Sequence, residues 1–200
     1  MEFLINKLHK KGVVILDFGS QYTQLIARRV REQNVYSEVL PTDTPLYKIK
    51  DRDPSAIILS GGPSSVFEDE APSFDKNILE IGVPILGICY GLQLLANHYD
   101  GLVESNGQGE YGFAEIEIDD NKKLFQNVSK TSQVWMSHMD RVTKIPNGWH
   151  VLAHSSNGVI AAMSNQDQSI VATQFHPEVA HTEEGKIFLN NFLFKIANCS

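Results

Sequence analysis

The chain has 200 residues, of which 24 are acidic and 17 basic, for a formal net charge of −7. That length fits one domain with a buried core, and the acidic balance argues against nucleic acid as the main partner, because phosphate binding requires a basic surface. Hydrophobic residues make up 42% of the chain, as in ordinary globular proteins, and no apolar run approaches membrane-spanning length, so no membrane partner is expected either.

The first eleven residues carry a short apolar segment followed by lysines, without the apolar core and cleavage site of a signal peptide. The two cysteines, Cys89 and Cys199, are too few for a disulfide framework, which favours a reducing compartment. We therefore predict a cytoplasmic protein that consists of an N-terminal extension, residues 1–11, and a single domain, residues 12–200.

The first half of the chain alternates predicted strands with predicted helices. Strands are predicted over residues 13–18, 35–40, 56–60 and 84–88. The first is a continuous apolar run, which is typical of a strand buried on both faces. Apolar residues at helical spacing predict helices over residues 23–33, 73–81 and 91–99. Three arginines of the first helix are expected to form a solvated face: Arg28, Arg29 and Arg31. This alternation predicts right-handed βαβ units and a parallel sheet.

The second half consists mainly of short strands, predicted over residues 113–118, 134–135, 150–154, 159–163 and 170–175. Asn147-Gly148 and Asn157-Gly158 are turn signals typical of hairpins. A final helix is predicted over residues 184–197, with Thr182 as its expected N-cap. The predicted fold class is α/β, with an open, mostly parallel central sheet flanked by helices and a smaller antiparallel extension in the second half.

The segment Gly87-Ile88-Cys89-Tyr90-Gly91 joins a predicted buried strand to a predicted helix. A nucleophile at such a tight turn projects from the backbone into a cleft, and small flanking residues allow neighbouring backbone to approach. The N–H groups and partial positive charge of the following helix favour a thiolate on Cys89. Cys89 is therefore a candidate nucleophile, although this segment alone also fits a buried structural cysteine.

A catalytic thiol needs a base, and the base needs an orienting group. Among seven histidines, His176 is distinguished because the apolar strand 170–175 leads directly into His176-Pro177-Glu178. Residues two apart in an extended chain point to the same side, so Glu178 can lie beside the His176 imidazole. Pro177 restrains the backbone between them. We predict catalytic roles for Cys89, His176 and Glu178.

An acyl-transfer site also needs hydrogen-bond donors for the oxyanion. The backbone N–H of Tyr90, directly after the nucleophile, is one candidate. The other is the N–H of Gly62 in Gly61-Gly62-Pro63, because glycine lets the main chain approach a ligand closely. Alone, this segment would indicate an ordinary turn. Both segments follow predicted parallel strands, however, and active sites of open α/β sheets lie at the carboxyl ends of such strands.

Three motifs together resemble the class I (triad-type) glutamine amidotransferases: Ser-Gly-Gly-Pro at 60–63, Gly-Ile-Cys-Tyr-Gly-Leu-Gln at 87–93 and His-Pro-Glu at 176–178. Segments 17–29 and 134–138 are similar to the amidotransferase domain of the GMP synthases, and the resemblance covers nearly the whole chain after about Lys11. It implies a flavodoxin-like fold and a γ-glutamyl thioester on Cys89. It also implies contacts to glutamine from Gly61, Gln93, Ser137 and His138.

The resemblance further implies a reaction and a partner. The domain would hydrolyse glutamine to glutamate and ammonia, and the ammonia would serve the ATP-dependent amination of XMP to GMP on an ATP-pyrophosphatase (synthetase) domain. Nothing in these 200 residues resembles the phosphate-binding loop of that synthetase domain. ATP and Mg²⁺ are therefore expected only there, with no metal or cofactor in this domain. We expect the chain to be an excised domain, and the alternative is a natural separate subunit.

Two positions depart from the family pattern. Met139 follows Ser137-His138 where the family has a small residue, and Gly109 precedes Glu110-Tyr111-Gly112 where arginine is expected. By resemblance, Met139 would crowd a loop near the glutamine site, and Gly109 removes a cation that could anchor substrate or a neighbouring domain. A non-catalytic regulatory or scaffolding module therefore stays open. So does another use of the triad: γ-glutamyl peptide hydrolysis, or ammonia supply for anthranilate or carbamoyl phosphate synthesis.

Overall fold

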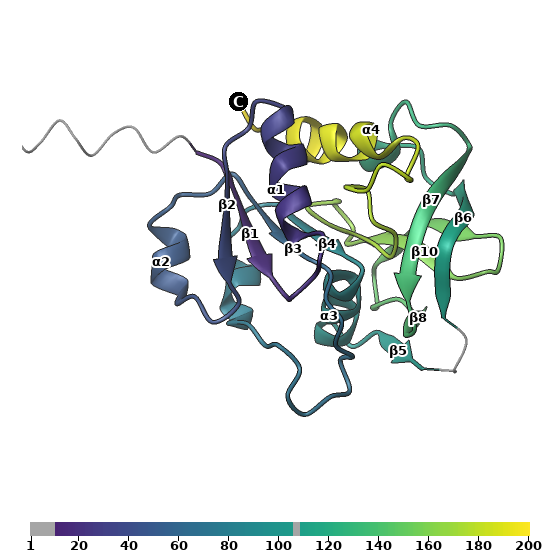
Figure 1. The fold of residues 1–200 in the computed structure, drawn as a ribbon, viewed down its shortest axis with the longest axis horizontal. Helices are drawn as coiled ribbons and strands as arrows, with labels where there is room; N and C mark the ends of the chain where they lie inside the picture. Colours follow the sequence, from purple (N-terminus) through teal and green to yellow (C-terminus); the bar gives the residue numbers. More distant parts are fainter. Residues whose placement is uncertain (1–10, 106–108) are drawn as a thin grey trace, which may run out of the picture.

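A nine-stranded mixed sheet forms the centre of the computed structural model, which describes residues 11–105 and 109–200 (Figure 1). Its strand order is β2-β1-β3-β4-β11-β10-β9-β6-β7. Neighbouring parallel strands are β1 (Val13–Asp17), β2 (Ser37–Pro41), β3 (Ala56–Leu59), β4 (Ile85–Ile88) and β11 (Ile170–Thr173). Antiparallel to their neighbours are β10 (Ile160–Ser164), β9 (His150–Ser155), β6 (Glu110–Ile118) and β7 (Thr131–His138). The predicted fold class is confirmed.

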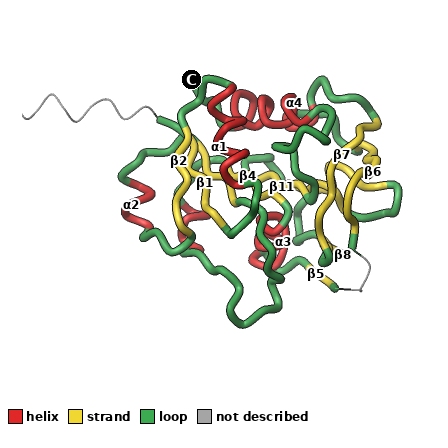
Figure 2. Tube along the Cα trace, in the orientation of Figure 1, coloured by secondary structure: helices red, strands yellow, loops and turns green. Residues whose placement is uncertain are grey.

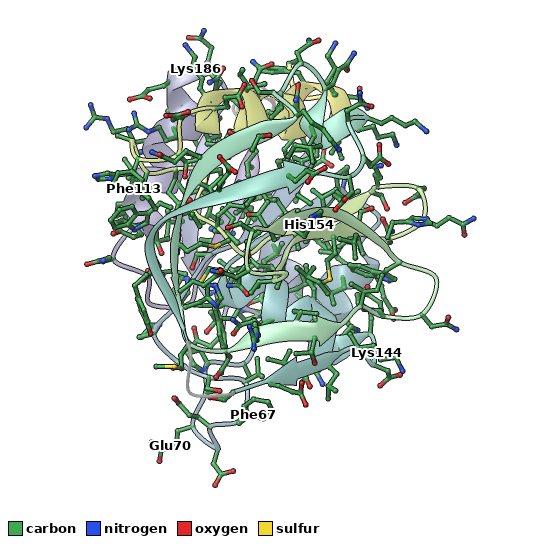
Figure 3. The ribbon with its side chains drawn as sticks, turned by 90° about the vertical axis from the view of Figure 1, so that its right-hand side faces the viewer. Phe67, Glu70, Phe113, Lys144, His154 and Lys186 are labelled. Atoms are coloured by element: carbon green, nitrogen blue, oxygen red, sulfur yellow. The ribbon has the colours of Figure 1, made fainter. Side chains whose placement is uncertain are left out.

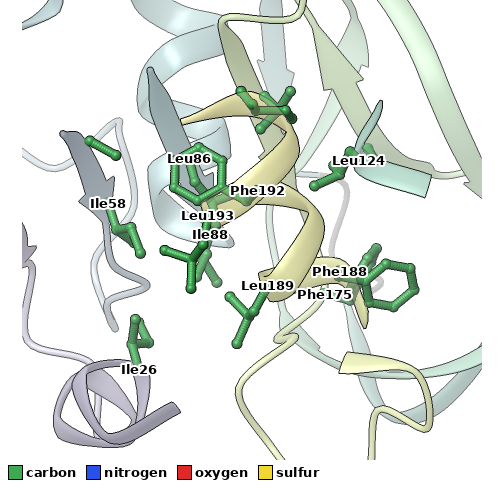
Figure 4. Close-up of a cluster of buried hydrophobic side chains, with 14 of the residues drawn as sticks. Ile26, Ile58, Leu86, Ile88, Leu124, Phe175, Phe188, Leu189, Phe192 and Leu193 are labelled. Atoms are coloured by element: carbon green, nitrogen blue, oxygen red, sulfur yellow. The ribbon is translucent and has the colours of Figure 1, made fainter. Parts of the chain in front are cut away.

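Helices cover both faces of the parallel strands because those strands are apolar on both sides. In β1, Val13 and Ile15 belong to one core, and Val14 and Leu16 belong to the core on the opposite face. The first core is covered by α1 (Thr23–Glu32), α4 (Gly185–Asn190) and the π-helix Asn191–Ile196. The second is covered by α2 (Leu46–Lys50) and α3 (Tyr90–His98). Figure 2 shows this layering, and Figure 4 shows side chains from α1, the parallel strands and the C-terminal helix meeting in the first core.

Several short elements differ from the predictions. The helix predicted over residues 73–81 is a 3₁₀-helix, Lys76–Glu80, which begins where the Asp75 carboxylate accepts a hydrogen bond from the Asn77 amide at 3.0 Å. Four elements were missed among the described residues: α2, the 3₁₀-helix Lys123–Phe125, and the strands β5 (Leu102–Glu104) and β8 (Arg141–Lys144), which form a separate two-stranded sheet. These segments are too short for a periodic apolar pattern to identify them.

The two Asn-Gly turns have different roles. Asn157-Gly158 joins β9 to β10, which pair as an antiparallel hairpin, and Gly158 has a φ of +75°. That prediction is confirmed. Asn147-Gly148 connects β8 to β9, which belong to different sheets, so the hairpin predicted there is wrong. A turn signal reports a local change of direction, whereas the pairing of the flanking strands depends on distant partners.

The predicted N-terminal extension, residues 1–11, lies outside the described residues except for Lys11. The Lys11 ammonium forms an exposed ion pair with Asp53 at 2.9 Å. In the part of the chain that the structure describes, no helix has both the length and the apolar character needed to cross a membrane.

Candidate active site

Cys89 lies at a sharp turn between β4 and α3. Its backbone has φ +53° and ψ −104°, a conformation that residues with side chains adopt only when the surrounding structure imposes it. The Cys89 amide donates to the Thr173 carbonyl oxygen of β11 at 2.7 Å, and α3 begins at the next residue, Tyr90. The N-terminal end of α3 therefore carries its partial positive charge beside the sulfur.

Gly91 allows α3 to pack directly on β3. A Cβ added at Gly91 would lie 2.5 Å from the Leu59 carbonyl oxygen, so the helix would have to move. We therefore expect Gly91→Ala to lower the free energy of unfolding by about 2–3 kcal/mol, measured by urea unfolding. Gly158→Ala is the control, because φ there is +75° but no atom lies within 4 Å of an added Cβ. It should cost about 1 kcal/mol, and equal losses at both positions would contradict the steric explanation.

Strand pairing brings the His-Pro-Glu segment to the Cys89 turn. β4 and β11 are parallel neighbours, with Ile88 opposite Thr173, so the residues that follow the two strands meet at one edge of the sheet. The His176 Nδ1 atom lies 2.7 Å from Glu178 Oε1. The Cβ position of Gly61 lies 3.1 Å from His176 Cε1 and 3.5 Å from Cys89 Cβ, so the imidazole and the thiol side chain meet at this glycine. The structure thus brings the three predicted triad residues together.

Charge and hydrogen bonding favour a protonated His176. Burial alone would lower the pKa of His176, but the charge of Glu178 and hydrogen bonds with Cys89 and Glu178 outweigh burial and raise the pKa well above 6.5. A thiolate on Cys89 beside this imidazolium is the pairing that activates a cysteine nucleophile. The arrangement can therefore present a nucleophilic sulfur together with a proton donor for a leaving group.

Thr182 holds the backbone of the His-Pro-Glu segment. Its hydroxyl donates to the His176 carbonyl oxygen at 2.7 Å and accepts from the Trp135 amide at 3.0 Å. The predicted role of Thr182 as N-cap of the last helix is therefore wrong, because the cap position is Glu184. Thr182 instead connects β7 to the residues after β11, and so fixes the direction in which the imidazole leaves the chain.

Arg29 also reaches the triad, so its assignment to a solvated face is wrong. Its Nε donates to the Glu178 carbonyl oxygen at 3.0 Å, and its Nη1 pairs with Glu32 at 2.9 Å. Arg28 is exposed and pairs with Glu32 at 3.1 Å, in keeping with the predicted solvated face. The difference arises because α1 packs on the same face of the sheet as α4, which places one side of α1 beside the residues that follow β11.

Gln174 is a buried residue at the thiol that the sequence reasoning missed. Its Nε2 atom lies 3.6 Å from Cys89 Sγ, and its Oε1 accepts from Gln93 Nε2 at 3.4 Å. Gln174 precedes His176 by two residues after β11, and in extended chain that spacing turns both side chains to one side. The signal for Gln174 in the sequence is this two-residue spacing, which also predicts that Glu178 lies beside His176.

The loop after β3 places the glycine pair next to the nucleophile. A Cβ at Gly62 would clash with the Phe18 carbonyl oxygen, so glycine alone fits this close approach. Ser60 ties the two loops together, because its hydroxyl accepts from the Phe18 amide at 2.9 Å and donates to the Gly61 carbonyl oxygen at 2.8 Å. The oxyanion roles of the Gly62 and Tyr90 N–H groups stay predictions.

A cavity of about 740 Å³ opens at this edge of the sheet, within the size range of small-molecule sites. Its lining includes seven predicted site residues: Gly62, Cys89, Tyr90, Gln93, Ser137, His138 and His176. Gly61 and Glu178 are not among the lining residues, and both lie next to His176. Phe67, labelled in Figure 3, comes from the projecting loop after β3 and also lines the cavity. Within residues 11–105 and 109–200, no three His, Cys, Asp or Glu side chains gather as a metal site.

The two departures from the family pattern touch each other. A Cβ at Gly109 would clash with the His138 carbonyl oxygen and would lie 3.1 Å from Met139 Cα. The absence of a side chain at Gly109 therefore lets the backbone of residues 138 and 139 lie against it. Met139 is 44% exposed and lines the cavity. Gly109 and Met139 thus belong to one packing arrangement at the cavity wall.

Comparison with known sequences points to one family. Residues 14–196 match the family model described as "Glutamine amidotransferase class-I". The chain is 53% identical over 191 residues to a GMP synthase [glutamine-hydrolyzing] of Maridesulfovibrio salexigens. This alignment covers 94% of this chain and 37% of that relative. It is 51% identical over 192 residues to the same-named protein of Campylobacter jejuni subsp. jejuni serotype O:23/36, covering 96% of this chain and 38% of the relative. The chain therefore spans less than two fifths of these relatives.

Solved structures agree with the fold. A Thermoplasma acidophilum protein named for one subunit of GMP synthase superposes with a TM-score of 0.86 at 29% identity, and the match covers 95% of each chain. A glutamine amidotransferase from Thermotoga maritima superposes with a TM-score of 0.70 at 23% identity, covering 96% of this chain and 87% of that one. The second similarity concerns the fold alone.

Proposed function

This chain belongs to the class-I glutamine amidotransferase family, and we propose that it hydrolyses glutamine to glutamate and ammonia. The observation that carries the proposal is the position of Cys89, at a strained turn beside the hydrogen-bonded pair of His176 and Glu178, on the wall of a cavity of about 740 Å³. A thiol nucleophile, a base and an orienting carboxylate are the groups that amide hydrolysis through a thioester requires.

Hydrolysis begins with formation of a thioester. The Cys89 thiolate attacks the side-chain amide carbon of glutamine, and the backbone N–H groups of Gly62 and Tyr90 stabilise the oxyanion that develops. The imidazolium of His176 donates its proton to the departing nitrogen, and ammonia leaves as the C–N bond breaks. Cys89 then carries a γ-glutamyl thioester, and His176 is neutral.

Water completes the reaction. Neutral His176 takes a proton from a water molecule as its oxygen attacks the thioester carbon, and the C–S bond breaks to release glutamate. The thiolate and the imidazolium are thereby restored. Glu178 accepts the hydrogen bond from His176 Nδ1 throughout, which leaves Nε2 for proton transfer. The amino-acid end of glutamine is proposed to contact Gly61, Gln93 and Ser137.

The ammonia is proposed to serve a synthetase. The curated relatives are named GMP synthase, and this chain spans 37% of the Maridesulfovibrio protein and 38% of the Campylobacter protein. We propose that residues 12–200 form the amidotransferase domain, and that an ATP-pyrophosphatase domain or subunit uses its ammonia to convert XMP to GMP. ATP and Mg²⁺ would bind to that partner, and this domain would need neither.

A coupled assay tests both levels of the proposal. With glutamine, the chain is expected to release glutamate. With the synthetase domain of a GMP synthase relative, XMP, ATP and Mg²⁺, glutamine should support GMP formation. Ammonium chloride in place of glutamine shows that the synthetase domain is active. Glutamate release without GMP formation from glutamine would reject the XMP assignment. Labelling of Cys89 by a glutamine-analogue electrophile without any glutamate release would indicate a non-catalytic module.

A further inference from the structure

A histidine beside the cavity uses both ring nitrogens within the protein. His138 is 5% exposed, its Nδ1 lies 2.8 Å from the Asp140 carbonyl oxygen, and its Nε2 lies 2.9 Å from Glu110 Oε2. A carbonyl oxygen can only accept a hydrogen bond, so Nδ1 carries a proton. Nε2 is held by the Glu110 side chain.

Glu110 has the surroundings of a carboxylate. Its Oε1 accepts from the Ser155 hydroxyl and from Asn157 Nδ2, each at 3.1 Å. The hydrogen bond from His138 and those from Asn157 and Ser155 outweigh burial and lower the pKa of Glu110. Both ring nitrogens of His138 are therefore engaged within the protein, and the Glu110 carboxylate ties the ring to β6.

The segment that His138 fixes forms one wall of the cavity. Cys89 Sγ lies 3.5 Å from the Ser137 carbonyl oxygen, and the Asp140 carbonyl oxygen accepts from Gln93 Nε2 at 2.9 Å. The Asp140 carboxylate also accepts a hydrogen bond from the Ser65 hydroxyl. Residues 137–140 thus contact the nucleophile, α3 and the loop after β3, and His138 ties the centre of this segment to β6.

We propose that His138 is a positioning residue, held by Glu110 and by the Asp140 carbonyl oxygen, that fixes residues 137–140 against Cys89 and Gln93 without itself contacting glutamine. The inference rests on the proposed glutamine site. It replaces the direct substrate contact that the family resemblance implied for His138, because no ring nitrogen is left for a ligand. A hydrogen bond to a carboxylate is stronger than one between neutral groups, so this pair can hold a wall that is otherwise made of loop.

The two ring contacts of His138 are measured from the ¹⁵N resonances of its imidazole in the 200-residue chain. Glu110→Gln should shift the Nε2 resonance, because the contact of Nε2 with the Glu110 carboxylate is changed. The Gln93 side-chain amide resonances should shift in the same variant, because the Asp140 carbonyl oxygen moves. Asp119→Asn is the matched control, since His154 Nδ1 lies 2.8 Å from Asp119 Oδ2 in an exposed pair. It should change neither His138 nor Gln93.

Steady-state kinetics test the role. Glu110→Gln is expected to raise KM for glutamine about tenfold and to change kcat by less than about threefold, because the wall is displaced while the triad stays in place. Asn157→Ala, which removes one donor to Glu110 from an exposed loop, should raise KM about twofold. Asp119→Asn should change neither constant. The KM effect is expected without a matching loss of thermal stability in Asn157→Ala.

Three results would overturn the inference: an unchanged His138 Nε2 resonance in Glu110→Gln, an unchanged KM in both Glu110→Gln and Asn157→Ala, or equal loss of kcat and stability in both. If the wild type releases no glutamate, the proposed function fails. The ring and Gln93 resonances then still decide whether Glu110 and His138 hold the wall, since neither measurement needs turnover.

Discussion

Cys89→Ala is expected to lower glutamine hydrolysis by at least about 10⁴-fold, because no other group can form the thioester. Glutamate release is the measurement, and covalent labelling by a glutamine-analogue electrophile should disappear with it. The substitution shortens a side chain at a cavity wall, so the free energy of unfolding should change little. Loss of activity with an intact fold would assign the sulfur to the chemistry and not to the core.

Cys199→Ala is the matched control for the nucleophile. The chain has two cysteines, both are buried, and Cys199 packs in the core beneath the C-terminal helix. Burial raises the pKa of the Cys199 thiol, so it should react slowly with the electrophile. Activity and labelling of Cys199→Ala should match the wild type. Retention of glutaminase activity in Cys89→Ala would sink the proposed mechanism.

Glu178→Gln is expected to reduce kcat for glutamine hydrolysis by about 10³-fold. The Glu178 carboxylate accepts from His176 Nδ1 at 2.7 Å. The Gln side chain in Glu178→Gln has the same shape as Glu178, but it lacks the negative charge that stabilises the imidazolium. KM should change much less, because Glu178 lies behind the cavity lining. Asp119→Asn removes a carboxylate from an exposed His154 pair of similar length, 2.8 Å, and should leave kcat unchanged. His154, labelled in Figure 3, belongs to β9, outside the cavity lining.

The same variant should change the pH profile in a defined direction. Burial lowers the pKa of His176, and the charge of Glu178 is the first of the effects that raise it well above 6.5. Without that charge the pKa of His176 must fall. The imidazolium that protonates the departing nitrogen is therefore deprotonated at a lower pH than in the wild type. The alkaline limb of kcat/KM should therefore move to lower pH in Glu178→Gln. An alkaline limb that keeps its pH or moves to higher pH would contradict the role assigned to Glu178.

The parallel half of the fold could be predicted because its signals are local. The strands β1, β3 and β4 are continuous apolar runs, and burial on both faces demands that composition wherever the strand lies in the sheet. The predicted helix over residues 73–81 failed because a short segment capped by Asp75 buries only Ile78 and Leu79 in the 3₁₀-helix. One turn of that size leaves too little apolar periodicity to separate a 3₁₀-helix from an α-helix.

The proximity of Cys89, His176 and Glu178 could be predicted for the same local reason. Cys89 is framed by glycines two residues away on either side, and His176 and Glu178 stand two apart after a strand, so each motif carries its own geometry. Contacts between distant segments depended on strand register and helix packing. The pairing of β6 with β7 sets Glu110 opposite His138, and the packing of α1 beside α4 brings Arg29 to the Glu178 carbonyl oxygen. A run of residues specifies its own periodicity but not its partner, because one step of register turns every side chain to the other face.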